Sequence, residues 1–172
     1  MLVHTIGHGT RPLDELLECL RSAGVETLVD VRRLPGSRRN PQFGQERLRQ
    51  ALSEVDIAYR HAVELGGLRA GEPGEERFAC IRTPAFRSYV ARMGRPKWQE
   101  ALSAALAEPA PCFMCAETPW RRCHRSLIAE LLAARAHEVV HLIRPGENEP
   151  HRPAAAAEHL GRKLLLCGQI VA

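Results

Sequence analysis

The sequence predicts an α/β fold, a single-domain three-layer sandwich in which a mostly parallel sheet carries helices on both faces. Its 172 residues are the usual length of one domain. A hydrophobic content of 45% is enough to build a buried core. Short apolar runs alternate along the chain with segments of helical periodicity, and strands that alternate with helices favour right-handed crossovers and parallel pairing.

The first part of the chain is expected to contain three strands and two helices. Residues 2–6, 27–31 and 57–61 are short apolar or alternating runs typical of strands. The first helix is indicated by leucines at helical spacing that end before Gly24, and the second by a similar pattern over residues 48–55. Between the second strand and the second helix lies a loop that contains Pro35 and Pro41.

The later part continues the alternation. A Gly/Pro-rich loop from Glu64 to Pro84 leads to two helical patterns over residues 86–93 and 98–106. Residues 112–115 are expected to form a buried strand, and Thr118 and Pro119 resemble the N-cap and first turn of a helix that runs to about Ala134. A last strand is expected over residues 138–143.

We expect residues 1–143 to form the α/β domain and residues 144–172 to form a C-terminal extension that can pack back on it. The first part of this extension, as far as Glu158, is rich in Pro, Gly, Glu and Ala and is expected to be irregular. Residues 164–167 fit an edge strand, a helix or a dimer contact, so a homo-oligomer stays open.

Composition gives general expectations about partners and location. The formal charge of +4 is too small to indicate nucleic-acid binding, and of the 24 basic residues only Lys97 and Lys163 are lysines. Base composition of the genome can explain this arginine excess, so only clustered arginines count as evidence. The six cysteines lack the dense spacing of a secreted disulfide framework, and no apolar run approaches a membrane span. We therefore expect reduced thiols, no membrane partner and a cytoplasmic protein.

Polar residues follow the predicted strands, and in such sheets ligands bind at the carboxyl ends of the strands. His8 follows the first strand between two glycines, and a turn with an exposed histidine would look the same. Asp30 ends the second strand, where a buried carboxylate needs a partner such as an arginine or a histidine. Tyr59 lies in the third strand. The loop after Asp30 carries candidate anion-binding side chains, although a solvated charge run would be similar: Arg32, Arg33, Ser37, Arg38 and Arg39.

The segment from Cys115 to Arg125 admits three interpretations. Zinc could be bound by Cys115, Cys123 and His124, although no four-ligand set has ordinary spacing. The five residues between Cys115 and Arg121 match the spacing of a cysteine nucleophile and a phosphate-binding arginine, but Glu117 and Pro119 replace the small residues of such a loop.

The third interpretation, which we favour, makes Glu117 and His124 an acid–base pair in an arginine-lined pocket. In it Arg121 and Arg125, four residues apart, share one face of the expected helix and reach across to the arginines of the loop after Asp30. Cys123 is expected to pack in the lining of the same pocket.

Ordered motifs between Thr5 and about Arg152 resemble the domain of unknown function 488 family, an uncharacterised family of bacteria and archaea. They are Thr5-Ile6-Gly7-His8, residues 30–43 from Asp-Val-Arg-Arg to Pro-Gln-Phe, Leu65-Gly66-Gly67, Cys115-Ala116-Glu117, Pro119-Trp120-Arg121, residues 123–129 from Cys-His-Arg, Val140-His141 and Pro150-His151-Arg152. Gly9 departs from the pattern, because relatives usually carry serine there.

The resemblance implies an α/β domain with one shared polar site and no settled reaction. It places His8, Asp30, Arg32, Glu117, Cys123, His124 and Arg125 in that site. It also implies that His151 folds back toward the same rim, where it would contact substrate.

Two classes of function remain open. The first is an enzyme, a hydrolase or a nucleotide- or nucleic-acid-processing enzyme, in which His8, Asp30, Glu117 and His124 are catalytic and the arginines hold a phosphorylated substrate. The second is a non-catalytic module that senses a nucleotide or nucleic acid. A metal-dependent hydrolase is a further alternative. In the favoured interpretation the partner is an anionic small molecule or nucleotide, and no cofactor or metal is bound.

Overall fold

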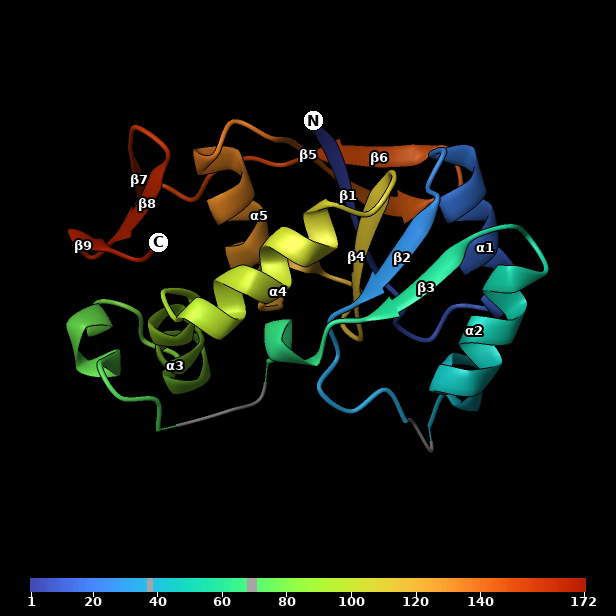
Figure 1. Ribbon diagram of the computed structural model, residues 1–172, viewed down its shortest axis with the longest axis horizontal. Coiled ribbons are helices and arrows are strands. Elements are labelled where there is room, and N and C mark those ends of the chain that lie inside the picture. Colours follow the sequence, from blue (N-terminus) through green and yellow to red (C-terminus); the bar gives the residue numbers. More distant parts are fainter. Residues whose placement is uncertain (37–38, 68–70) are drawn as a thin grey trace.

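The computed structural model describes residues 1–36, 39–67 and 71–172, and its centre is a six-stranded sheet with the strand order β3-β2-β4-β1-β5-β6 (Figure 1). The strands are β1 Leu2–Gly7, β2 Thr27–Asp30, β3 Ala58–His61, β4 Pro111–Cys115, β5 Glu138–Arg144 and β6 Glu147–Pro150. Strands β1 to β5 pair in parallel, and β6 pairs with β5 antiparallel. The predicted α/β fold with a mostly parallel sheet is therefore confirmed.

Helices cover both faces of the sheet. They are α1 Leu13–Ser22, α2 Gln45–Ser53, α3 Pro84–Met93, α4 Pro96–Leu106 and α5 Arg125–Ala134. The chain moves outward from β1 to β2 and β3 and then returns to β4, which lies between β2 and β1. Because crossovers are right-handed, this reversal places α1 and α2 on one face and α3 to α5 on the other (Figure 1).

Alternating side chains of the strands supply two cores, one for each face. In β4, Cys112 and Met114 pack with α1 and α2, whereas Phe113 and Cys115 pack with α3, α4 and α5. Both sets are fully buried, as expected for the central strands of a parallel sheet. Because β4 is packed on both faces, its carboxyl end is held between the carboxyl ends of β2 and β1.

The start of α5 differs from the sequence prediction. Trp120–Arg122 form a short 3₁₀ helix, Cys123 is extended, and α5 begins only at Arg125. Thr118 therefore does not cap this helix. Trp120 is buried with its ring stacked 3.9 Å from that of His141, and this tertiary contact competes with a continuous helix. Arg121 and Arg125 consequently do not share a helical face.

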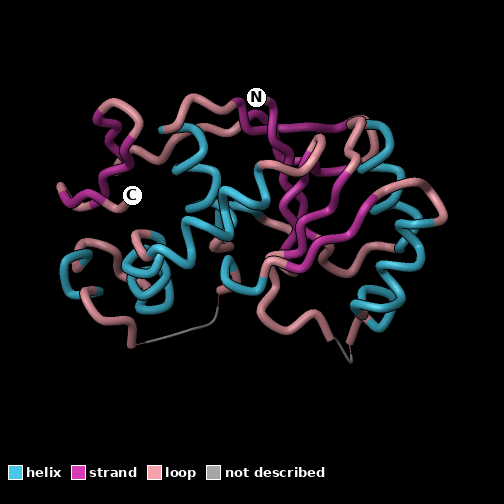
Figure 2. The backbone as a smooth tube through the Cα atoms, viewed as in Figure 1, coloured by secondary structure: helices cyan, strands magenta, loops and turns pink. Residues whose placement is uncertain are grey.

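The C-terminal segment is more ordered than its composition suggests. Glu147–Pro150 form β6 instead of an irregular segment, and the chain then makes a small antiparallel sheet of the order β7-β8-β9 (Figure 2). Its strands are β7 Ala157–Leu160, β8 Lys163–Leu166 and β9 Gln169–Ile170. Leu164 and Leu166 of β8 are buried in the core that contains α5. Residues 164–166 are thus a central strand, not an edge strand or a helix.

A disulfide corrects the expectation that all cysteines are reduced. Cys80 and Cys167 are bonded to each other, with 5.8 Å between their Cα atoms and a sequence separation of 87. The bond links the loop before α3 to the turn after β8. Cys19, Cys112, Cys115 and Cys123 are free and buried.

Among the described residues there is no helix with the length and apolar character needed to cross a membrane.

Candidate functional site

Two adjoining pockets lie at the carboxyl edge of the parallel sheet, where ligands bind in α/β folds. The first has a volume of about 220 Å³ and the second about 310 Å³. Arg32, Leu34 and Ala116 line both pockets. Because β4 lies between β1 and β2, Ala116 at the tip of β4 sits between the loops that follow its two neighbours.

The first pocket, on the side of α3, combines positive charge with an apolar wall. Arg32, Arg33 and Arg122 contribute the positive charge, and Glu117 is the carboxylate among its described lining residues. Phe86 and Tyr89 of α3 form the apolar wall. The rest of the lining consists of Leu34, Gly67, Ala85, Ala116, Cys123 and His124. This combination suits a ligand with an anionic group attached to an apolar or aromatic body.

The second pocket is more polar and lies between the loops after β1 and β2. His8 and Thr10 come from the loop after β1, and Arg39 and Asn40 come from the loop after β2. The remaining described lining residues are Gly9, Arg32, Leu34, Gly36 and Ala116. Arg39 is exposed, so its guanidinium can contact a phosphate or another anion that enters from solvent.

Asp30 is fully buried and is committed to Arg32 and Tyr59. It accepts hydrogen bonds from Nε and Nη2 of Arg32, at 2.9 and 2.6 Å, and from the backbone N–H of Arg32 at 3.0 Å. The hydroxyl of Tyr59 donates to Oδ2 of Asp30 at 2.7 Å, and burial together with the Asp30 charge raises the pKa of Tyr59. Asp30 and Tyr59 therefore hold the arginine that both pockets share, and neither is among the described lining residues of these two pockets.

His8 is also enclosed by structural partners. Its Nδ1 lies 2.8 Å from the carbonyl oxygen of Gly9, and Nη1 of Arg32 lies 3.3 Å from its Nε2. The ring stacks on Phe43 with 4.4 Å between centroids. Burial lowers the pKa of His8, so the ring is neutral, with a proton on Nδ1 and with Nε2 accepting from Arg32. His8 shapes the second pocket and orients Arg32.

Glu117 and His124 are the predicted acid–base residues that face one pocket together. Glu117 is exposed at the tip of β4, and His124 immediately precedes α5. Burial lowers the pKa of His124 to about 4, and the nearby charge of Glu117 only partly opposes this effect. The imidazole packs against Gly67, where a Cβ would lie 2.8 Å from Nδ1. A neutral imidazole and a carboxylate thus line the same pocket.

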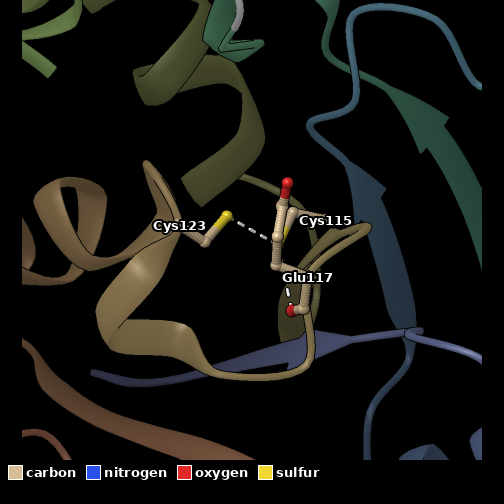
Figure 3. Close-up of side chains that lie close together, drawn as sticks. All are labelled: Cys115, Glu117 and Cys123. Carbon is tan, nitrogen blue, oxygen red and sulfur yellow. Dashed lines mark hydrogen bonds between the residues drawn. The ribbon is translucent and has the colours of Figure 1, made fainter. Parts of the chain in front are cut away.

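Cys115 and Cys123 approach each other at the tip of β4 (Figure 3), and Cys123 lines the first pocket. Their Sγ atoms are 2.7 Å apart, and the ligand atoms of Cys115, Glu117 and Cys123 all lie within 4.8 Å of one another. A metal ion could therefore be held by these three residues. The alternative set with His124 is not the one that the geometry brings together, although Nδ1 of His124 is 3.5 Å from Sγ of Cys123.

Arg125 is buried below the loop after β4 and lines neither pocket. Its Nη2 donates to the carbonyl oxygens of Glu117 and Thr118, at 3.2 and 3.1 Å. Gly7 makes this packing possible, because a Cβ at that position would lie 1.9 Å from the Glu117 carbonyl oxygen. A Cβ at Gly9 would similarly lie 2.0 Å from Oγ1 of Thr118. Arg125 supports the shape of the loop that carries Glu117.

Arg121 and His151 lie at β5 and β6, away from both pockets. Arg121 pairs with Glu149 of β6 at 2.6 Å and stacks over Trp120. His151 lies 3.1 Å from His141 and 3.5 Å from Glu130 of α5. Among the described residues, neither Arg121 nor Arg125 lines the pockets that Arg32, Arg33 and Arg39 line.

Arg33 and Arg39, two other predicted binding residues, line the first and the second pocket respectively. Ser37 and Arg38 lie outside the described residues. Arg122, which lines the first pocket, was not predicted, because the spacing of Arg121 from Cys115 and from Arg125 favoured Arg121 instead. Phe86 and Tyr89 were not predicted as pocket residues either, because their helical spacing is equally typical of core positions.

Comparison with known proteins gives a family but no characterised relative. No curated protein and no solved structure matches the sequence. The family model described as "Domain of unknown function DUF488" matches residues 12–132, a range that contains β2, β3 and β4, the loop after β2 and the segment from Cys115 to Arg125. The chain therefore belongs to the DUF488 family of domains of unknown function.

Proposed function

We propose that this chain binds a small phosphorylated, nucleotide-like anion across the two adjoining pockets and acts on it by acid–base chemistry. The observation that carries the proposal is the uneven charge of the lining. Four arginines, Arg32, Arg33, Arg39 and Arg122, line the pockets. Asp30 neutralises Arg32, so the excess positive charge comes from Arg33, Arg39 and Arg122, against the carboxylate of Glu117 among the described lining residues. Arginine forks match phosphate oxygens, and several around one cleft favour a multiply charged ligand.

The two pockets differ in a way that supports a ligand with two unlike ends. The first pocket has the apolar wall of Phe86 and Tyr89, which suits a base or another planar group. The second has Thr10, Arg39 and Asn40, which suit a phosphate. Arg32 lies between them, so one ligand can occupy both pockets.

Glu117 and His124 support the catalytic half of the proposal. Both line the first pocket, and the low pKa of His124 keeps its ring neutral at pH 7. In the proposed reaction the arginines neutralise the anion, and Glu117 takes a proton from the water or hydroxyl group whose oxygen attacks phosphorus. The bond from phosphorus to the leaving oxygen breaks, and His124 passes a proton from Glu117 to that oxygen. The reaction class is hydrolysis or transfer at the phosphorylated group.

A second candidate function is a binding module without catalysis. It is favoured by the bonding of two other predicted catalytic groups: Asp30 is saturated by Arg32 and Tyr59, and both ring nitrogens of His8 have partners. The arginine lining is the same in both candidates. They differ only in what Glu117 and His124 do.

The test is a ligand screen followed by a turnover assay. Nucleoside monophosphates, sugar phosphates and short oligonucleotides are added in a thermal-shift assay, and a ligand at a hundred times its Kd should raise Tm by about 5 to 10 °C. Wild-type protein and Glu117→Gln are then incubated with the best ligand. Turnover that is lost in Glu117→Gln with unchanged Kd supports the enzyme. Binding without turnover supports the module, and no shift with any phosphorylated ligand contradicts both.

A further inference from the structure

Cys115 and Cys123 are a pair of thiols that the acid–base reaction does not use. Cys115 ends β4 and is fully buried, and Cys123 is 2% exposed and lines the first pocket. Their sulfur atoms are 2.7 Å apart, with the Cys123 thiol donating to the sulfur of Cys115 (Figure 3). Closing this separation to the 2.03 to 2.05 Å of a disulfide needs a movement of less than about 1 Å.

The charges around the pair act in opposite directions, because the guanidinium of Arg125 favours a thiolate and the carboxylate of Glu117, which lies within 4.8 Å of both sulfur atoms, opposes it. Arg125 is 1% exposed, and among the described residues no carboxylate pairs with its guanidinium, whose Nε and Nη1 have no hydrogen-bond partner there. A buried cation without a counter-ion is costly. The backbone N–H of Arg125 donates to Sγ of Cys123 at 3.5 Å, a contact that a thiolate at Cys123 would strengthen.

We propose that Cys115 and Cys123 form a redox-active dithiol that a hydroperoxide, entering through the first pocket, oxidises to an intramolecular disulfide. Hydrogen peroxide is small enough to reach the sulfur of Cys123, which faces a pocket of about 220 Å³. Arg33 and Arg122 line the same pocket, so its charge does not repel the developing hydroxide.

The reaction proceeds in two balanced steps. Cys123, whose sulfur lines the first pocket, first loses its proton, and its thiolate attacks one peroxide oxygen. The O–O bond breaks, hydroxide leaves, and Cys123 becomes a sulfenic acid. The sulfur of Cys115 then attacks Cys123, the S–O bond breaks, and water leaves with the Cys115 proton. Hydroxide takes up the proton released when the pair ionised, so two thiols and one peroxide give one disulfide and two waters.

The experiment is peroxide titration of the native protein, followed by alkylation under denaturing conditions and peptide mapping by mass spectrometry. The Cys80–Cys167 disulfide is present before and after, and serves as an internal reference. We expect a Cys115–Cys123 linkage that dithiothreitol reverses. Cys112, whose pKa burial raises and which faces the opposite core, should be oxidised at least about tenfold more slowly.

Two variants separate the roles of the sulfur atoms. Cys115→Ser should stop at a Cys123 sulfenic acid that dimedone captures, whereas the matched control Cys112→Ser should form the Cys115–Cys123 linkage at the wild-type rate. The proposal is overturned if the folded wild-type protein keeps both thiols alkylatable, if they react no faster than Cys112, or if the purified protein carries one zinc ion per chain on these thiols.

Oxidation also changes Cys123, whose sulfur lies 3.5 Å from Nδ1 of His124 in the lining of the first pocket. An effect of this change on ligand binding rests on the proposed function. Nucleoside monophosphate affinity is therefore compared between the reduced and the peroxide-treated protein. A loss of affinity after oxidation shows that the dithiol controls the pocket, and equal affinity rejects that control. If the reduced protein binds no phosphorylated ligand, the proposed function fails, while the mapped disulfide still decides the redox proposal.

Discussion

Replacing Asp30 by alanine should be among the most destabilising single changes in this protein. The side chain is fully buried and accepts hydrogen bonds from the backbone, Nε and Nη2 of Arg32 and from Tyr59. Arg32 itself is only 6% exposed, so Asp30→Ala leaves a buried guanidinium without its carboxylate. Breaking a buried pair in this way costs about 3 to 5 kcal/mol. For a chain of this length that corresponds to a fall in Tm of roughly 6 to 20 °C.

Urea unfolding followed by circular dichroism measures the effect, with two comparison variants. Glu46→Ala removes the ion pair with Arg49, whose side chains are 77% and 64% exposed, and should cost below about 0.5 kcal/mol. Asp30→Ala combined with Arg32→Met removes both charges and should recover much of the loss. A loss below about 1 kcal/mol in Asp30→Ala, or a double variant less stable than the single one, would refute this account of the pair.

Three further predictions concern the loops and the buried histidines. Gly7→Ala should destabilise by about 1 to 3 kcal/mol in urea unfolding, because its Cβ would meet the Glu117 carbonyl. Gly36→Ala, at a position where no atom of the described residues lies within 4 Å of an added Cβ, should change stability by less than about 0.5 kcal/mol. The pKa of His124 in the folded protein, about 4, is below the usual value, so unfolding takes up a proton and the free energy of unfolding falls as pH drops from about 6.5 to 4. His124→Gln should make this fall with pH less steep in a pH series of urea unfolding curves. An equally steep fall in the variant would contradict this prediction. His151→Ala should lower stability by about 1 to 3 kcal/mol, because it removes the contacts of His151 with His141 and Glu130. Nucleotide affinity measured by calorimetry should not change. Weaker nucleotide binding would show that His151 belongs to the binding site.

The sequence predicted the fold because hydrophobic periodicity is a local property of the elements that build it. The strands at residues 2–6, 27–31 and 138–143 and the helices between them follow this pattern closely in the structure. The start of α5 escaped prediction because the local signal at Thr118 and Pro119 competes with the stacking of Trp120 on His141, a contact between distant segments. The Cys80–Cys167 disulfide joins residues 87 apart, and no local pattern carries that information.

The candidate site could be predicted by residue type more readily than by role. Asp30 and His8 come to the predicted edge of the sheet, but the sequence could not show that their hydrogen-bonding capacity is used by Arg32 and its neighbours. Arg121 and Arg122 are adjacent and chemically identical, yet a 3₁₀ turn directs one to Glu149 and the other to the first pocket.

This pair of neighbouring arginines provides the most direct test of the anion-binding pocket. Isothermal titration calorimetry compares nucleoside monophosphate binding by the wild-type protein, Arg122→Ala and Arg121→Ala, which have the same net charge change. Losing a charged hydrogen bond costs about 1.5 to 3 kcal/mol, so Arg122→Ala should raise Kd roughly 10- to 100-fold. Arg121→Ala should leave Kd at the wild-type value, because Arg121 is paired with Glu149 outside both pockets. Equal losses in the two variants would mean that a diffuse positive surface attracts the ligand, and would contradict binding in the pocket.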